Sequence, residues 1–218
     1  MSRFDALIFD LDGTLWDTCQ ACAVAWNRVL ARHAISFRSI VAEDVRRVTG
    51  RPHEECIRTV FHGLPESQLR LLTRETMEED NRAVAELGGQ LYPCVESGVK
   101  ALAQHYPLFI VSNCQSGYIE TFLAWSGLGP HFTDIECWGN TGLTKAENLA
   151  WLILRNGLDA PLMVGDTEGD RTAAEACGAP FAFVNYGFGN CAQFDYSLNS
   201  FRELVSLLVP LATGTVTR

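Results

Sequence analysis

The sequence has no long hydrophobic run. No apolar stretch in the 218 residues reaches the roughly 18 uninterrupted residues that suggest a membrane-spanning helix. The first residues also lack a basic segment followed by a long apolar one, the pattern of a secretory signal. We therefore expect a cytoplasmic protein that does not bind membranes.

Lysine is scarce. Lys100 and Lys145 are the only lysines among 17 basic residues, and with 26 acidic residues the formal net charge is −9. Such a charge repels nucleic acids and anionic membranes, so we expect neither as a partner. Residues 16–92 carry ten arginines against eleven acidic residues, which leaves that segment nearly neutral and the remainder strongly acidic.

The sequence also lacks a complete zinc-type motif. Cys19 and Cys22 form a C-x-x-C pair, but no second pair and no histidine cluster accompanies it. The eight cysteines are scattered through apolar surroundings of a mid-sized chain. This favours reduced, mostly buried thiols over a disulfide framework.

The spacing of apolar residues divides the chain into segments of two kinds. Residues 4–11 are mainly apolar, as in a buried strand, and residues 18–87 show helical spacing broken by glycine and proline. After residue 93 strands and helices alternate, which predicts an α/β fold with a parallel sheet between two helical layers. The expected strands there are 108–113, 132–138, 162–166 and 181–185, and the expected helices are 95–105, 117–126, 145–156, 170–177 and 201–208.

Polar side chains gather where these strands end. In an open parallel sheet such positions border one crevice beyond the carboxyl ends of the strands. Several carboxylates at close range need a cation, and oxygen ligands suit Mg²⁺. A carboxylate nucleophile, a metal, a lysine and a hydroxyl together indicate phosphoryl transfer. The residues are Asp10, Asp12, Ser112, Asn113, Lys145, Asp166 and Asp170.

Four motifs in order resemble those of the haloacid dehalogenase superfamily, specifically its phosphatases with a helical cap inserted after the first motif. Asp10-Leu-Asp-Gly-Thr matches D-x-D-G-T, Val111-Ser-Asn the second motif, Lys145 the third, and Gly165 to Asp170 the fourth, G-D-x-x-x-D. The resemblance covers nearly the whole chain. It implies a Rossmann-like core, residues 1–15 and 93–218, and an inserted all-helical cap domain, residues 16–92.

The resemblance also implies a role for each motif residue. Asp10 attacks phosphorus and becomes phosphorylated, while Asp12 protonates the leaving oxygen and then activates water. Asp10, the backbone carbonyl of Asp12, and Asp166 hold Mg²⁺, and Asp170 helps directly or through water. Ser112 with nearby backbone amides, together with Asn113 and Lys145, binds the phosphoryl oxygens and the substrate.

The alternatives to this interpretation are structural. Asp12 with Gly13 is also a common turn pair, Ser112 could cap a helix, and acidic residues such as Asp166 are favoured at helix starts. A non-catalytic binding protein on the same scaffold is a further alternative. The four motifs together favour the enzyme.

The resemblance narrows the chemistry. Dehalogenases lack the second aspartate of the first motif, so Asp12 argues against them. Similar sugar phosphomutases usually carry an acidic residue where this chain has Gly165, so a phosphatase is favoured and a mutase is the alternative.

The substrate expected from the resemblance is a small soluble phosphomonoester of the phosphoglycolate type, handled by a monomer or homodimer. Arg51, in a Gly-x-Pro loop of the insert, is a candidate to contact a second anionic group of this substrate. Its alternative role is a solvated side chain or a pair with Glu54 or Glu55. Trp16 adjoins the first motif and is a candidate pocket residue, with hinge packing as its alternative.

Overall fold

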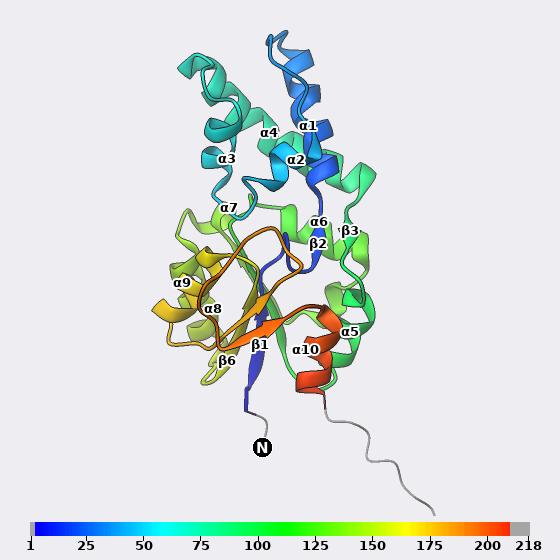
Figure 1. Cartoon of the computed structure of the whole chain (residues 1–218), viewed down its shortest axis with the longest axis vertical. Coiled ribbons are helices and arrows are strands. Elements are labelled where there is room, and N and C mark those ends of the chain that lie inside the picture. The colour runs from blue at the N-terminus through cyan, green and yellow to red at the C-terminus, as the bar shows by residue number, and fades with distance from the viewer. Residues whose placement is uncertain (1–2, 210–218) are drawn as a thin grey trace, which may run out of the picture.

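A six-stranded sheet forms the centre of the protein, seen in a computed structural model that describes residues 3–209 (Figure 1). All its strand pairs are parallel, and β1 lies between β4 and β6. The order across the sheet is β5-β4-β1-β6-β7-β8. The strands are β1 (Ala6–Phe9), β4 (Leu108–Ser112), β5 (Asp134–Cys137), β6 (Pro161–Gly165), β7 (Phe181–Val184) and β8 (Tyr196–Leu198).

Helices cover both faces of the sheet. One face buries Leu7 and Phe9 of β1 in a core shared with α5, α6 and α10, and the other buries Ala6 and Ile8 against α8 and α9. Alternate residues of β1 therefore enter opposite cores, as a strand buried on both sides requires. The helices of this part are α5 (Val95–Leu102), α6 (Tyr118–Ser126), α7 (Trp138–Thr141), α8 (Lys145–Asn156), α9 (Glu168–Ala176) and α10 (Phe201–Leu208), with a 3₁₀ turn η1 (Gly129–His131).

Residues 18–87, which we call the helical insert, stand over the end of the sheet to which β1 points (Figure 1). The long helix α4 packs along α1, and their contact holds the insert together. Trp26 and Phe61 lie in its apolar core with rings 5.8 Å apart. The four helices are α1 (Cys19–Arg32), α2 (Ala42–Arg46), α3 (His53–Val60) and α4 (Glu66–Leu87).

The chain enters and leaves the helical insert through two short strands that pair with each other. β2 (Trp16–Asp17) and β3 (Gln90–Leu91) form a separate antiparallel ribbon. Polar contacts also join the insert to the sheet end, since Asn113 Nδ2 donates to the Gly50 carbonyl at 2.9 Å and Asn81 Nδ2 donates to the Ser116 carbonyl at 2.9 Å. The insert is therefore docked on the ends of the strands.

The α/β fold expected from the sequence is confirmed, and the helices expected at 145–156 and 201–208 have those bounds. The prediction missed β8, the short helix α7 and the ribbon strands β2 and β3. These elements have two to four residues, too few for a periodicity to register. All eight cysteines are free. Among residues 3–209, no helix combines the length and the apolar character needed to cross a bilayer.

Candidate active site

Asp10 follows the central strand and is buried at the carboxyl edge of the sheet. Its backbone N–H bonds to the carbonyl of Val164 at 2.8 Å, which continues the pairing of β1 with β6 beyond the last strand residue. Only 4% of the Asp10 surface is exposed. The residue is therefore held in place by the pairing of the two central strands.

Lys145 lies between two carboxylates. Its ammonium group donates to Oδ1 of Asp10 and, at 2.5 Å, to Oδ1 of Asp170. Burial alone would lower the pKa of Lys145, but the two carboxylates outweigh burial and raise it. Lys145 is therefore a fixed positive charge beside Asp10.

The helix that carries Lys145 starts at a capping box. Thr144 accepts from the N–H of Glu147, and the Glu147 carboxylate accepts from the Thr144 N–H at 2.8 Å. This reciprocal cap sets the first residue of α8, so that Lys145 projects into the crevice from the first turn.

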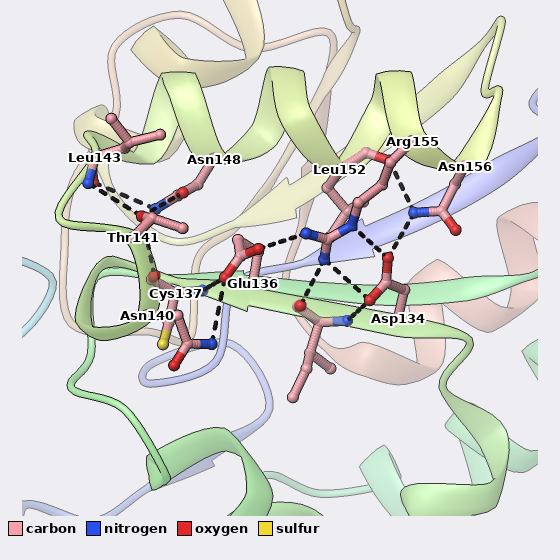
Figure 2. A network of polar contacts seen from close by, with 11 residues as sticks. Asp134, Glu136, Cys137, Asn140, Thr141, Leu143, Asn148, Leu152, Arg155 and Asn156 are labelled. Carbon is pink, nitrogen blue, oxygen red and sulfur yellow. Dashed lines mark hydrogen bonds and ion pairs between the residues drawn. The ribbon is translucent and has the colours of Figure 1, made fainter.

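A network at the other end of α8 ties the helix to β5 (Figure 2). Arg155 donates to Asp134 at 2.6 and 2.9 Å, to the carbonyl of Ile135 at 2.8 Å, and to the carboxylate of Glu136. Thr141 donates to Asn148 at 2.7 Å, which fixes α7 against the first turn of α8. This contact is also drawn in Figure 2. The position of Lys145 thus rests on contacts along the whole helix.

Asp166 and Asp170 come from the end of β6 and the first turn of α9. Asp170 caps that turn, because its Oδ2 accepts from the backbone and hydroxyl of Thr167 at 2.9 and 2.7 Å. Asp166 accepts from Thr14 and from the backbone N–H of Phe188 at 2.7 Å. One carboxylate oxygen from each of Asp10, Asp166 and Asp170 lies within 4.8 Å of the others.

Burial and neighbouring negative charge raise the pKa values of Asp10 and Asp166. The pKa of Asp10 rises to about 6, because burial and Asp170 together outweigh Lys145. Burial raises the pKa of Asp166 well above its usual range, and the charges of Asp10 and Asp170 add to the effect. Such a cluster, with one lysine against three carboxylates, lacks positive charge.

Gly13 permits this close approach. Its φ is +89°, and a Cβ there would lie 2.3 Å from Oδ2 of Asp166. Glycine alone avoids both the strained backbone and the clash. The glycine of the first motif thus makes room for the aspartate of the fourth.

Asp12 points away from the carboxylate cluster toward the helical insert. Its Oδ1 accepts from the hydroxyls of Thr18 and Tyr118, each at 3.1 Å. Burial and the charge of Asp10 raise the pKa of Asp12 to about 7, although these hydrogen bonds oppose the rise. A carboxyl group with that pKa can give and take a proton near neutral pH.

Ser112 and Asn113 end β4 beside the same crevice. Ser112 is buried, and its Oγ accepts from the N–H of Cys114 at 3.2 Å. The Asn113 amide faces the insert, where it donates to Gly50. Both residues line a cavity of about 70 Å³ that also contacts Asp10, Asp12 and, on the insert side, Asp80.

The two candidates outside the motifs have different outcomes. Arg51 lines this cavity, while its guanidinium pairs with Glu55 at 3.2 Å on the exposed surface. Trp16 is fully buried, and its ring packs against Tyr118 and Phe122 with centroids 5.7 and 4.8 Å away. The expectation that Trp16 contacts substrate is corrected, because packing in the ribbon of β2 and β3 leaves none of its surface exposed.

Sequence reasoning missed four contributors to the site. Thr14 belongs to the quoted D-x-D-G-T motif, and Gly187 lies in a G-x-G turn just after β7, where a Cβ would lie 2.2 Å from Cβ of Asp166. Both had a readable signal at a strand end. Thr18 and Tyr118 had none, because their contacts with Asp12 depend on how the insert docks.

This combination of a parallel α/β sheet, an aspartate pair after the central strand and a lysine bridging two carboxylates defines the class. The model of the haloacid dehalogenase-like hydrolases matches residues 7–184. The chain belongs to this family of hydrolases.

Phosphatases are among its relatives. The chain is 28% identical to the phosphoglycolate phosphatase of Vibrio vulnificus strain YJ016, over 93% of this chain and 95% of that one. It is 29% identical to the phosphoglycolate phosphatase of Vibrio cholerae, over 87% and 88% respectively. The hydrolase class expected from the sequence is confirmed.

Solved structures share the fold at lower identity. A haloacid dehalogenase-like family hydrolase from Streptococcus pneumoniae superposes with a TM-score of 0.82 at 22% identity, covering 95% of this chain and 99% of that one. A predicted phosphoglycolate phosphatase from Haemophilus somnus gives 0.81 at 22% identity with the same coverage. At this identity the likeness establishes the fold.

Proposed function

We propose that this protein is a Mg²⁺-dependent phosphatase that hydrolyses a small phosphomonoester through a phosphorylated Asp10. The observation that carries the proposal is the set of groups around Asp10: Lys145 beside the nucleophile, Asp12 on the insert side, and the carboxylate cluster on the other. Phosphoglycolate is the first candidate substrate, because the named relatives act on it.

The donor set fits a hard divalent cation. Asp10, Asp166 and Asp170 offer carboxylate oxygens within reach of a single ion. The raised pKa values of Asp10 and Asp166 reflect burial and like-charge repulsion, and a cation relieves the repulsion. We propose these residues, with the backbone carbonyl of Asp12, as the Mg²⁺ ligands. The ion would offset negative charge between Asp10 and the phosphoryl group.

The residues divide the reaction between them. Asp10 is the nucleophile, and Lys145 holds it ionised and oriented. Asp12, which retains a proton near neutral pH, protonates the leaving oxygen and later removes a proton from the attacking water. Ser112, Asn113 and Lys145 contact the phosphoryl oxygens or the substrate, and this assignment extends the motif roles to the cavity that the residues share.

We further propose that residues 16–92 act as a cap domain on the core of residues 1–15 and 93–218. Tyr118 of the core and Thr18 of the insert both bond to Asp12, so docking completes the surroundings of the acid. Closure of this kind excludes water from the reacting groups.

Gly165 supports a phosphatase over a phosphomutase. A Cβ at this position would lie 2.6 Å from Cβ of Asp170, so an acidic side chain there requires Asp170 to move. Free phosphate, rather than an isomeric phosphate ester, is the expected product.

The test measures phosphate release from a panel of phosphomonoesters with and without Mg²⁺. Wild type should release phosphate only with the metal, and Asp10→Asn should be inactive. As a readout independent of turnover, Mg²⁺ should raise the melting midpoint of wild type and have little effect on Asp166→Asn. Activity retained by Asp10→Asn, or equal activity in a metal chelator, would overturn the mechanism.

A further inference from the structure

A buried polar pair from the helical insert lines the same cavity as Asp10. Asp80 of α4 and His53 at the start of α3 line the cavity and are 3% and 7% exposed. Neither belongs to a motif or to the chemistry assigned above. A buried ionisable pair in the wall of the cavity that contains Asp10 and Asp12 is a candidate for a functional role.

The hydrogen bonds around the pair fix which ring nitrogen of His53 carries the proton. Thr76 donates its hydroxyl proton to the Leu72 carbonyl at 2.6 Å, so Nε2 of His53 must donate to Thr76 at 2.7 Å. In a neutral ring Nδ1 then carries a lone pair, and it faces Oδ2 of Asp80 at 3.7 Å. At this distance the two atoms do not share a hydrogen bond, and the pair is neutral overall when Asp80 keeps its own proton.

Burial favours the neutral forms of both groups. It raises the pKa of Asp80 well above its usual range, although the hydrogen bond from Trp26 and the nearby Cys22 thiol oppose the rise. It also lowers the pKa of His53 to about 4. The pair therefore offers little positive charge for a substrate carboxylate.

One oxygen of Asp80 remains available. Oδ2 accepts from Trp26 Nε1 at 3.2 Å and faces His53, whereas Oδ1 is buried and has no hydrogen-bond partner within residues 3–209. The nearby Cys22 thiol is only a weak donor, and its geometric hydrogen bond goes to Thr18 at 3.8 Å. Oδ1 of Asp80 is therefore a buried acceptor whose hydrogen-bonding capacity is unsatisfied.

We infer that Asp80 selects substrates whose leaving group carries a hydroxyl that donates to its Oδ1, with His53 and Trp26 as positioning residues. The inference rests on the proposed phosphatase function and refines its substrate class. The cavity of about 70 Å³ has room for a small leaving group. A short hydroxyalkyl phosphate fits this description better than phosphoglycolate, whose carboxylate has no proton to donate at neutral pH.

The experiment compares 3-hydroxypropyl phosphate with n-propyl phosphate, which differ by this hydroxyl, and adds phosphoglycolate. Wild type should favour the hydroxyl ester by roughly tenfold in kcat/KM, the effect of one hydrogen bond to a buried acceptor. Asp80→Ala should reduce that ratio to near one. Asp80→Asn, which keeps an oxygen, should retain much of it.

The matched control is Asp44→Ala. Asp44 is also a buried carboxylate of the insert, but it pairs with Arg38 at 2.6 and 2.8 Å and is not part of the cavity wall around Asp80. The control should leave the ratio unchanged. Because each ratio is measured on one preparation, a lower yield of folded protein cancels.

The outcomes separate the two proposals. Equal kcat/KM values for the two propyl esters, or a tenfold preference that survives Asp80→Ala, would refute the role of Asp80 while the phosphatase stands. If neither these esters nor the wider panel is hydrolysed with Mg²⁺, the proposed function fails. The affinities of the same esters for Asp10→Asn, measured by calorimetry, still test the hydroxyl preference in that case.

Discussion

Replacing Arg155 by methionine should destabilise the protein without removing its chemistry. Methionine keeps much of the side-chain stem but loses the bonds to Asp134, Ile135 and Glu136. The Glu136 side chain is 9% exposed and would lose its cation, keeping only bonds from Asn140 and its neighbouring backbone.

The magnitude follows from burial. Removing one partner of a fully buried ion pair costs about 3–5 kcal/mol. The Arg155 and Asp134 side chains are 31% and 29% exposed, so water replaces part of what they lose. We therefore expect a loss of about 2–3 kcal/mol in the free energy of unfolding, or roughly 5–10 °C in melting midpoint for a chain of this size.

The assay is urea unfolding of wild type, Arg155→Met and the double variant Arg155→Met with Glu136→Gln. The double variant removes the unpaired charge and should recover part of the loss. Arg58→Met is the matched control, since Arg58 makes three comparable bonds to Glu54 and Glu66 on the exposed surface and should matter far less.

The stability difference between wild type and Arg155→Met should depend on pH in a definite direction. Burial alone would raise the pKa of Asp134, but hydrogen bonds from Arg155 and Asn156 lower it below its usual value. Asp134 thus stabilises the fold above its unfolded pKa of about 4, and this contribution is lost as the pH falls. The gap between wild type and Arg155→Met should narrow on acidification. A variant as stable as wild type at pH 7, or a gap that widens in acid, would refute this reasoning.

Three further substitutions test the site. Position 13 has a φ of +89°, and a Cβ there would lie 2.3 Å from Oδ2 of Asp166. Gly13→Ala should therefore cost about 1–2 kcal/mol of unfolding free energy through backbone strain, measured by urea unfolding. It should also weaken Mg²⁺ binding in a metal titration, and a normal metal affinity would contradict the close packing. Tyr118→Phe removes a hydrogen bond to Asp12 and should lower kcat roughly fivefold with metal affinity unchanged, and an unaltered kcat would rule out that support. Arg51→Ala should impair hydrolysis of phosphoglycolate more than that of propyl phosphate if Arg51 leaves Glu55 to bind an anion, whereas equal losses would exclude that role.

The core could be predicted because its signals are local. The apolar run before Asp10, and the positions of Ser112, Lys145 and Asp166 at strand or helix ends, follow from chain order in a parallel sheet. The helical nature of residues 18–87 was equally readable from periodicity.

The surroundings of the motifs could not be predicted. Tyr118 reaches Asp12 over a separation of 106 residues, and Asp80 meets His53 only after α3 and α4 pack. Trp16 shows the same limit, because adjacency to a motif in sequence does not distinguish a pocket wall from a buried ring. Contacts between side chains that form only when one helical layer docks on another produce no periodic pattern in the sequence.

The ribbon of β2 and β3 brings the two ends of the helical insert together. The residues that leave the core at position 16 and return at position 91 are paired neighbours, so the segment between them spans no distance on the core. Its length and sequence are free to vary at little cost in chain entropy, because loop closure depends only weakly on loop length. A graft of another helical segment at these two strands should therefore change which molecules are accepted while leaving Asp10 in place.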